Sequence, residues 1–355
     1  MNITICGGGN LGHVCAGFLA ANDGNVVSLL TTSPQCWQPS IEVADCLGNT
    51  FVGSLARVSS EPSEIVANAD IVLFCLPGFA IHDRLLDVRP HLSSSTLVGS
   101  VISSTGFFFE AKGLLPPTQP LFGFQRVPFI ARITSYGRRA ELKGYKDALY
   151  LAVENCKDKE SVRLLMQQWF HVPVHLLAHY YEAALSNSNP LLHTARLYTM
   201  WKDWSPSEDS ETAPWFYADW TDEASQLLLD MDEEFQAILP ALGLRHGCVP
   251  PILAYYESED AASLTRKIRS IPAFQGIAAP MRRDRHGKYA PDFDNRYFTE
   301  DFPYGLRFAV KMAERCHIPS PHMHETYRWG MACLAKYGRL PQPFNEETYM
   351  ARKII

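Results

Sequence analysis

Three short segments of the sequence contain residues whose types and spacing could do chemistry on a small molecule. The glycine-rich segment at residues 7–12 could hold a phosphate, because backbone N–H groups at a helix start bind anions. The segment at residues 186–198, SNSNPLLHTARLY, contains a histidine that could carry a proton. The segment at residues 290–305, APDFDNRYFTEDFPYG, combines an arginine with several acids and could bind a carboxylate.

The glycine-rich segment GGGNLG fits the pattern G-x-G-x-x-G. Gly7 would permit the tight turn after a strand, Gly9 the close approach of a pyrophosphate, and Gly12 the packing of a helix on the strand. Asn10 and Leu11 would open the helix whose N–H groups hold the anion. A glycine turn without a ligand is the alternative, but the strand before the segment and the helix after it favour dinucleotide binding.

The residues after the second expected strand bear on the choice of cofactor. An acid at this place would hydrogen-bond the free 2′-hydroxyl of NAD. The sequence instead has Thr31, Thr32 and Ser33, which can donate to a 2′-phosphate and would not repel it. No arginine stands beside them, so the positive charge of a strong phosphate site is missing locally. The pattern favours NADP slightly and leaves NAD open.

His193 is the preferred proton carrier among the twelve histidines. A nicotinamide enzyme needs a group that gives or takes a proton beside the hydride carbon. Asn189 offers an amide that could orient a substrate, and Pro190 is expected to break the helix there. A core histidine with a satisfied ring explains the bare spacing equally well.

The acidic and aromatic segment at residues 290–305 has two interpretations as well. In one, Arg296 clamps a carboxylate while an acid polarises a histidine, fixing its tautomer and raising its basicity. In the other, the segment is an ordinary solvated loop. The nearby sequence PHMHE (321–325) has no partner at metal-site spacing, so we expect no metal.

The elements that must position these residues alternate between strand and helix up to about residue 178. MNITIC, NVVSLL, IVLFCLP, STLVGSVIS and VPVHLL read as strands, with helices expected at EPSEIVANAD (61–70) and KESVRLLMQQWF (159–170). This pattern predicts a doubly wound parallel sheet, a Rossmann fold. The later sequence shows mostly helical periodicity. We therefore expect a dinucleotide-binding domain at 1–178 and an all-α domain at 179–355.

Composition restricts the classes of partner. The 355 residues are 46% hydrophobic and 20% charged, and the net charge of −6 gives no electrostatic footprint for nucleic acid or an anionic membrane. Nine scattered cysteines without a C-x-x-C pair favour a reducing compartment. No leader or membrane-spanning run is visible at the sequence level. We expect a cytoplasmic protein that binds neither nucleic acid nor membranes.

Four segments of this sequence together resemble the octopine/nopaline (opine) dehydrogenase family. They are CGGGNLGHVCAGFLA, NPLLHTARLYTMW, APWFYADWTDEASQLLL and PDFDNRYFTEDFPYG, the last being the most specific. The resemblance implies a Rossmann domain and an all-helical domain of the 6-phosphogluconate dehydrogenase-like type, with substrates meeting in the cleft between them. It further implies an NAD(P)-dependent oxidoreductase acting on CH–NH donors. Such an enzyme condenses an L-amino acid with a 2-oxo acid such as pyruvate, reduces the imine with NADH or NADPH, and also runs the reverse oxidation.

The resemblance also implies roles for individual residues. His193 matches the catalytic histidine of the family and Asp301 its acidic partner. Arg296 matches an arginine that contacts a substrate carboxylate, and Asn189 falls at a neighbouring substrate-binding position. An aromatic cluster could shape an apolar amino-acid pocket or simply pack helices; it comprises Trp201, Trp204, Trp215, Phe216, Tyr217 and Trp220. Five further residues could face the cofactor or the oxo acid, namely Ser103, Ser104, Thr105, Gln125 and Arg132.

Two rival functions remain open from the sequence. A ketopantoate-reductase-like protein would reduce a 2-oxo acid without an amine, and would more often use a lysine where this chain has His193 and Arg296. A dinucleotide-sensing protein would keep the glycine loop and need no His193–Asp301 pair. A homodimer is our expectation for the oligomeric state.

Overall fold

The computed structural model describes residues 1–206, 210–283 and 287–338. They divide into two compact units, residues Met1–Ser186 and a second unit that begins at Asn187. The predicted functional division between residues 178 and 179 stays a prediction.

The first unit is built on a sheet of eleven strands, counted over the described residues. Its spatial order is β11-β10-β7-β6-β5-β1-β2-β4-β3-β9-β8. The strands are β1 (Asn2–Cys6), β2 (Val26–Leu30), β3 (Ser40–Asp45), β4 (Thr50–Ser59), β5 (Ile71–Phe74), β6 (Leu97–Ser100), β7 (Leu121–Phe124), β8 (Phe129–Ser135), β9 (Arg139–Tyr145), β10 (Leu149–Glu154) and β11 (Val174–Leu176).

The centre of this sheet is parallel. β1 pairs in parallel with both β2 and β5, and β5, β6 and β7 continue the parallel run. The chain therefore reverses its direction of winding at β1, and in such sheets ligands bind beyond the carboxyl ends of the strands at this point. β1 ends at Cys6, directly before the glycine-rich segment. The predicted Rossmann fold is confirmed.

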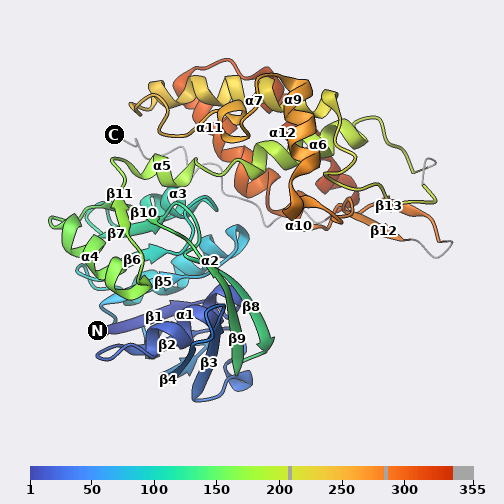
Figure 1. The fold of residues 1–355 in the computed structure, drawn as a ribbon. Coiled ribbons are helices and arrows are strands. Elements are labelled where there is room, and N and C mark those ends of the chain that lie inside the picture. The colour runs from blue at the N-terminus through green and yellow to red at the C-terminus, as the bar shows by residue number, and fades with distance from the viewer. Residues whose placement is uncertain (207–209, 284–286, 339–355) are drawn as a thin grey trace. The chain divides into compact units, whose positions relative to one another are not determined.

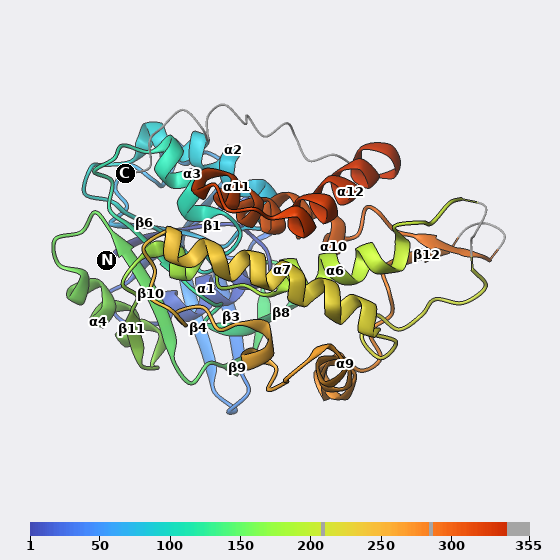
Figure 2. The same cartoon turned by 90° about the horizontal axis from the view of Figure 1, so that it is seen from above.

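Helices cover both faces of the sheet in the first unit. They are α1 (Asn10–Ala20), α2 (Gly78–Val88), α3 (Phe107–Leu114), α4 (Lys159–Phe170) and α5 (Tyr180–Ala184). Figure 2 shows α2 and α3 on one side of β1 and β6, with α1 and α4 on the other. The buried faces of α1 and α4 share one apolar core with the central strands, which fixes the start of α1 above the end of β1.

Two parts of the first unit differ from the sequence prediction. The helix expected at residues 61–70 is wrong, because only the single turn Pro62–Glu64 is helical. β3 and β4 form an antiparallel hairpin that no sequence pattern had predicted. Much of each strand in this hairpin is exposed, so polar and small residues interrupt the apolar ones and no continuous apolar run marks the strands in the sequence.

The second unit is mainly helical, as Figure 1 shows in yellow-green to red. Its α-helices are α6 (Asn189–Trp201), α7 (Asp222–Ala241), α8 (Ile252–Tyr255), α9 (Ala261–Ser270), α10 (Arg296–Thr299), α11 (Arg307–Cys316) and α12 (Pro321–Tyr337). A π-helix, η5 (Phe302–Leu306), leads directly into α11. α6 packs against α7, α12 and η5. The predicted helical second half is confirmed, with the addition of a short hairpin of β12 (Met281–Arg283) and β13 (Tyr289–Pro291).

No helix in the described part of the chain is long and apolar enough to cross a membrane.

Candidate active site

The glycine-rich segment forms a tight turn between β1 and α1. Gly7 has φ +119°, which L side chains rarely adopt, and a Cβ there would lie 2.6 Å from the carbonyl oxygen of Cys75. A Cβ on Gly12 would overlap the carbonyl oxygen of Gly7. A Cβ on Gly9, in contrast, would meet no atom within 4 Å. The first and third glycines are thus required by packing, whereas Gly9 borders open space at the start of α1, where an anion would bind.

The three hydroxyl residues after β2 differ in exposure. Thr31 is buried, Thr32 is exposed and Ser33 is half-buried. A Cβ on Gly8 would lie 2.8 Å from the Thr31 hydroxyl and 2.9 Å from the hydroxyl of Tyr136, so both oxygens border the backbone of the glycine turn. The sequence analysis missed Tyr136, because its position on the turn between β8 and β9 comes from a long-range strand pairing.

The side chains of His13 and Asn10 form hydrogen bonds that connect the β8–β9 hairpin to the start of α1, beside the glycine turn. The backbone N–H of Gly137 donates to Nε2 of His13 at 2.7 Å, so Nδ1 carries the proton and donates to the carbonyl oxygen of Gly9 at 3.0 Å. The N–H of Ile133 donates to the Asn10 side-chain oxygen at 2.8 Å. Burial lowers the pKa of His13, which keeps the ring neutral and both bonds intact. The structural role expected for this histidine fits these contacts.

The predicted proton carrier lies in the first turns of α6. Pro190 does not break a helix as expected; it occupies the second position of α6, where a backbone N–H is not needed. Asn189 begins the helix and is exposed, and His193 follows one turn later with an exposed fraction of 6%. Residues three and four apart share a face of a helix, so the two polar side chains lie on the same side of α6.

The imidazole of His193 bonds to two side chains. Nδ1 lies 2.8 Å from Oδ2 of Asp301, and Nε2 lies 2.8 Å from the hydroxyl of Tyr217. A carboxylate can only accept, so Nδ1 donates to Asp301. The structure thus brings together the predicted pair His193 and Asp301, and it leaves Nε2 as the nitrogen that can take up a proton.

A π-helix and one glycine set the position of Asp301. Asp301 directly precedes η5, and η5 packs against the start of α6. A Cβ on Gly305 would lie 2.5 Å from Cγ of Pro190, so only glycine permits this close approach of the two helices. Single π-helical turns are frequent at functional sites because they reorient one side chain within a helix.

Aromatic rings surround the imidazole. The ring of Tyr297 lies 4.4 Å from that of His193, and Phe216 and Tyr217 follow at 5.8 Å and 6.2 Å. Trp220 stacks on Tyr217. Phe216, Tyr217 and Trp220 belong to the aromatic cluster that the sequence suggested.

Other members of that cluster lie elsewhere in the second unit. Trp201 stacks on Phe298, Trp204 packs on Phe293, and Trp215 is 48% exposed. The sequence analysis missed Tyr297, although it directly follows Arg296.

Arg196 holds the segment that carries Tyr217. It lies three residues after His193 on α6, is 4% exposed, and donates to the carbonyl oxygens of Phe216 and Asp219 at 3.1 and 2.6 Å. Burial lowers the pKa of Arg196 to about 10. Burial also raises the pKa of Tyr217, with Tyr297 nearby adding to the effect, so Tyr217 keeps its proton.

Arg296 is exposed at the first position of α10. Among the described residues its guanidinium forms no ion pair, so its five N–H donors are available to a carboxylate. It directly precedes Tyr297, whose ring contacts His193.

The five residues suggested for the cofactor or oxo acid lie in the first unit. Ser103 and Ser104 are buried, and within the described residues their hydroxyls have no hydrogen-bond partner. Thr105 bonds to its own turn and Arg132 to a neighbouring carbonyl. Gln125 donates to the carbonyl oxygen of Glu182. Arg126, which the sequence analysis did not consider, donates to that of Ser186.

The PHMHE segment is the start of α12. His322 bonds to Glu234 at 2.8 Å and His324 to Glu314 at 3.1 Å, so both histidines are already held by acids. No group of residues that could hold a metal ion occurs in the described part of the chain.

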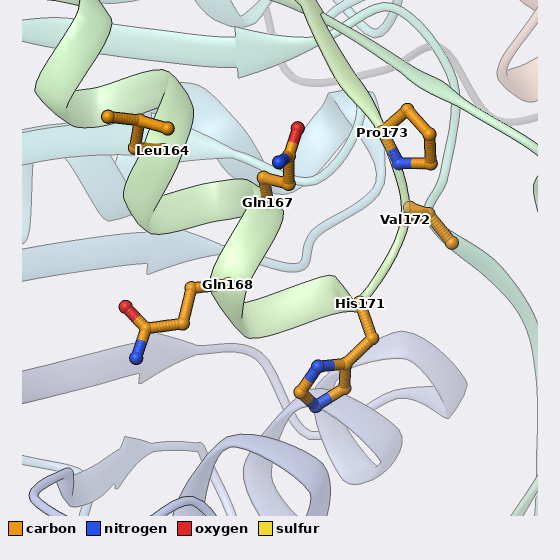
Figure 3. Close-up of a pocket in the computed structure, with 6 residues that line it drawn as sticks. All are labelled: Leu164, Gln167, Gln168, His171, Val172 and Pro173. Atoms are coloured by element: carbon orange, nitrogen blue, oxygen red, sulfur yellow. The ribbon is translucent and has the colours of Figure 1, made fainter.

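The surface pocket drawn in Figure 3 is formed by one end of α4 and the residues after it. It contains none of the predicted site residues. Its lining is Leu164, Gln167, Gln168, His171, Val172 and Pro173, without a carboxylate or a basic group beyond the one imidazole.

Comparison with known proteins links this arrangement to a family. Residues 176–334 match the family model described as NAD/NADP octopine/nopaline dehydrogenase, alpha-helical domain. The chain is 31% identical to the uncharacterized protein y4xO of Sinorhizobium fredii, covering 93% of this chain and 94% of that protein. It is 27% identical to tauropine dehydrogenase of Arabella iricolor, covering 94% and 91%.

The fold is shared as well. A solved structure of octopine dehydrogenase with NADH and L-arginine superposes with a TM-score of 0.83 at 24% identity, covering 94% of this chain and 89% of that one. These matches cover more than nine-tenths of the chain and therefore include parts of both units. The chain therefore belongs to the octopine/nopaline dehydrogenase family of NAD(P)-dependent oxidoreductases.

Proposed function

We propose that this protein is an opine dehydrogenase that joins an L-amino acid to a 2-oxo acid such as pyruvate and reduces the product to a secondary-amine dicarboxylate. The observation that carries the proposal is the pair of the buried His193 and the half-buried Asp301, with Nε2 as the basic nitrogen. The glycine turn, with open space at Gly9, supports dinucleotide binding. Neither rival function is favoured, because a tauropine, an opine and an octopine dehydrogenase match this chain over nearly its whole length.

Each residue of the site has a distinct role in this proposal. Arg296 neutralises a substrate carboxylate, and Asn189 orients the substrate beside it. His193 takes the proton of the substrate ammonium on Nε2, which frees the amine to attack the oxo acid, and it returns a proton as water leaves the carbinolamine. Asp301 fixes the tautomer of His193 and stabilises the imidazolium that forms. A bound nicotinamide cofactor supplies the hydride for the imine carbon.

The cofactor is held at the glycine turn by Gly7, Gly9 and Gly12, with Asn10 and Leu11 at the start of α1. Thr31, Thr32 and Ser33 follow β2 where an acid would select NAD, so we propose a preference for NADPH. Equal kcat/KM for NADPH and NADH would contradict this preference.

The aromatic rings around His193 suggest the class of amino acid. Phe216, Tyr217 and Tyr297 present apolar surface beside the imidazole. We propose an amino acid with a side chain more apolar than that of arginine. The substrates are small molecules. A homodimer, a cytoplasmic location and the absence of a nucleic-acid partner belong to the same proposal, and light scattering of the purified protein tests the first.

The test of the function is NADPH and NADH oxidation with pyruvate, alone and with each of the twenty L-amino acids. The proposal expects oxidation that depends on one amine or a few. Oxidation with pyruvate alone would indicate a ketone reductase instead. Cofactor binding without oxidation across the panel would indicate a dinucleotide sensor.

A further inference from the structure

The turn between β8 and β9 is attached to the segment that follows β2. The N–H of Gln38 donates to the carbonyl oxygen of Gly137 at 2.9 Å, and the N–H of Gly137 donates to Nε2 of His13 on α1. Gly137 has φ +68°, and a Cβ there would overlap the carbonyl oxygen of Cys36, so only glycine permits this close approach. The turn is therefore held beside the end of β2, where a Rossmann fold binds the adenosine ribose of its cofactor.

Three side chains border the backbone of Gly8 at this place. A Cβ on Gly8 would lie 2.8 Å from Oγ1 of Thr31, 2.9 Å from the hydroxyl of Tyr136 and 3.2 Å from Cζ2 of Trp37. Tyr136 is 44% exposed, so part of its ring is open to a ligand. Trp37 is 7% exposed, and its indole N–H has no hydrogen-bond partner among the described residues. Hydroxyl and indole donors thus gather beside the glycine turn, which suits a ligand group that accepts hydrogen bonds.

The β8–β9 turn also supplies a positive charge. Neighbouring strands of the sheet carry two arginines that are already paired with acids. Arg57 on β4 lies 2.9 Å from Glu64, and Arg139 at the start of β9 pairs with Glu42. Arg138, the last residue of the turn, is exposed and forms no ion pair with any residue that the structure describes. Its guanidinium therefore remains available to an anion.

We propose that Arg138 and Tyr136 bind the 2′-phosphate of the adenosine ribose and so select NADPH over NADH. A phosphate is negatively charged and only accepts hydrogen bonds from these side chains, whereas the 2′-hydroxyl of NADH is neutral and gains little from a guanidinium. The sequence has no arginine beside Thr31, Thr32 and Ser33. The hairpin brings the missing charge from a distant part of the chain. This inference deepens the proposed function, because it rests on the proposed preference for NADPH.

The test measures cofactor binding to the full-length protein without turnover. Fluorescence titration gives the Kd of NADPH and of NADH separately. We expect Arg138→Ala to bind NADPH roughly 10- to 100-fold more weakly than the wild type, because a hydrogen bond to a charged group is lost. The Kd of NADH is expected to stay at the wild-type value, since both cofactors share every other part that the protein contacts.

Two further variants separate charge from geometry. Arg138→Lys keeps the charge but loses the planar fork, so we expect an intermediate Kd for NADPH. Tyr136→Phe keeps the ring and removes only the hydroxyl, and we expect roughly 3- to 10-fold weaker binding of NADPH, again without a change for NADH. The matched control is Lys143→Ala, which removes an exposed positive charge from the far part of β9. It is expected to keep both wild-type Kd values.

The outcomes distinguish the inference from the proposed function. Wild-type Kd for NADPH in Arg138→Ala would overturn the inference, even in an active NADPH-dependent opine dehydrogenase. Equal losses of affinity for NADPH and NADH would also overturn it, because the contact would then lie on a part that the two cofactors share. Equal Kd values of both cofactors in the wild type would reject the inference together with the preference for NADPH. The expected losses in a protein without amine-dependent oxidation would support the inference and reject the opine reaction.

Discussion

At the scale of single residues, the site depends on one imidazole whose two nitrogens have different partners. Nδ1 donates to the carboxylate of Asp301, and Nε2 accepts from the hydroxyl of Tyr217. Burial of the ring removes competing water, so both bonds are stronger than they would be at the surface. A histidine buried only for packing needs neither a carboxylate at one nitrogen nor a hydroxyl at the other.

Replacing His193 tests its role as proton carrier. His193→Ala is expected to lower kcat by roughly 10²- to 10⁴-fold, because general acid–base catalysis contributes rates of this size. Cofactor binding, measured by fluorescence titration of NADPH, should be nearly unchanged. Wild-type turnover in the variant would remove His193 from the mechanism.

Replacing Arg296 tests the binding of the substrate carboxylate. Arg296→Ala is expected to raise KM for one of the two acids by roughly 10- to 100-fold, since a charge-assisted bond is worth about 1.5 to 3 kcal/mol. The control is Arg245→Ala, an exposed arginine in the turn after α7. Equal KM values in both variants and the wild type would contradict a substrate contact at Arg296.

At the scale of elements, the glycines of the turn between β1 and α1 have two different roles. Two are required by the packing of the fold, and one borders the space where a cofactor would bind. Gly7 and Gly12 have no room for a Cβ, whereas Gly9 borders open space. Gly9→Ala is therefore expected to fold with a Tm close to that of the wild type. Its methyl group would enter the space that a pyrophosphate needs, so NADPH should bind at least 10-fold more weakly. Wild-type affinity in this variant would argue that no pyrophosphate lies against Gly9.

The π-helix before α11 is the element that sets the His193–Asp301 distance. Gly305→Ala places a methyl group 2.5 Å from Cγ of Pro190 and should push η5 away from α6. We expect kcat to fall by roughly 10-fold or more, since small displacements of a catalytic group are costly. Gly113→Ala, where a Cβ meets no atom within 4 Å, is the control with an added methyl group. Wild-type kcat in both Gly305→Ala and Gly113→Ala would show that η5 can shift without disturbing the His193–Asp301 pair.

The contacts of His13 make the attachment of the β8–β9 hairpin dependent on pH. The pKa of His13 is lowered in the folded protein, so the folded state binds fewer protons than the unfolded state between the folded pKa and about 6.5. The contribution of His13 to the free energy of unfolding is present above about pH 6.5 and is lost as the pH falls through this window. The free energy of unfolding changes by no more than about 1.4 kcal/mol per pH unit through this one group.

The variant that tests this dependence is His13→Gln, whose amide can keep both bonds and does not titrate. Its Tm should fall less than that of the wild type between pH 7 and pH 5. His171→Asn, at an exposed histidine with φ +55°, should keep the wild-type dependence. The same fall of Tm between pH 7 and pH 5 in the wild type and both variants would show that groups other than His13 cause the pH dependence.

At the scale of the whole molecule, the two units supply different parts of the chemistry. The first provides the glycine turn at the point where the parallel sheet changes its direction of winding. In the proposed function the second provides the proton carrier, its acid and the exposed arginine, from α6 and from elements that pack on it. The net charge of −6 is compatible with small-molecule substrates, which in the proposed function are bound by local groups such as Arg296 and not by a field over a surface.

Local patterns in the sequence were sufficient for the elements with strong periodicity. The parallel strand β5 is a continuous apolar run because both of its faces are buried, and β1 and β6 are buried over most of their length. The glycine pattern follows from the turn geometry alone. His193 and Asp301 stand out by chemical type and by family resemblance. The expected helix at residues 61–70 is wrong because its capping signals form a single turn, Pro62–Glu64.

Only the tertiary structure decided which groups meet. Asp301 reaches His193 across 108 positions in the chain because a π-helix and Gly305 bring η5 close to Pro190. The sequence suggested Tyr217 only as one ring of an aromatic cluster and did not suggest Tyr136, since nothing local shows which hydroxyl ends beside an imidazole or a glycine turn. The sequence by itself determined the fold class and the residue types of the site. Their pairing depended on long-range packing, which has no local signal because each contact is set by the shape of several helices together.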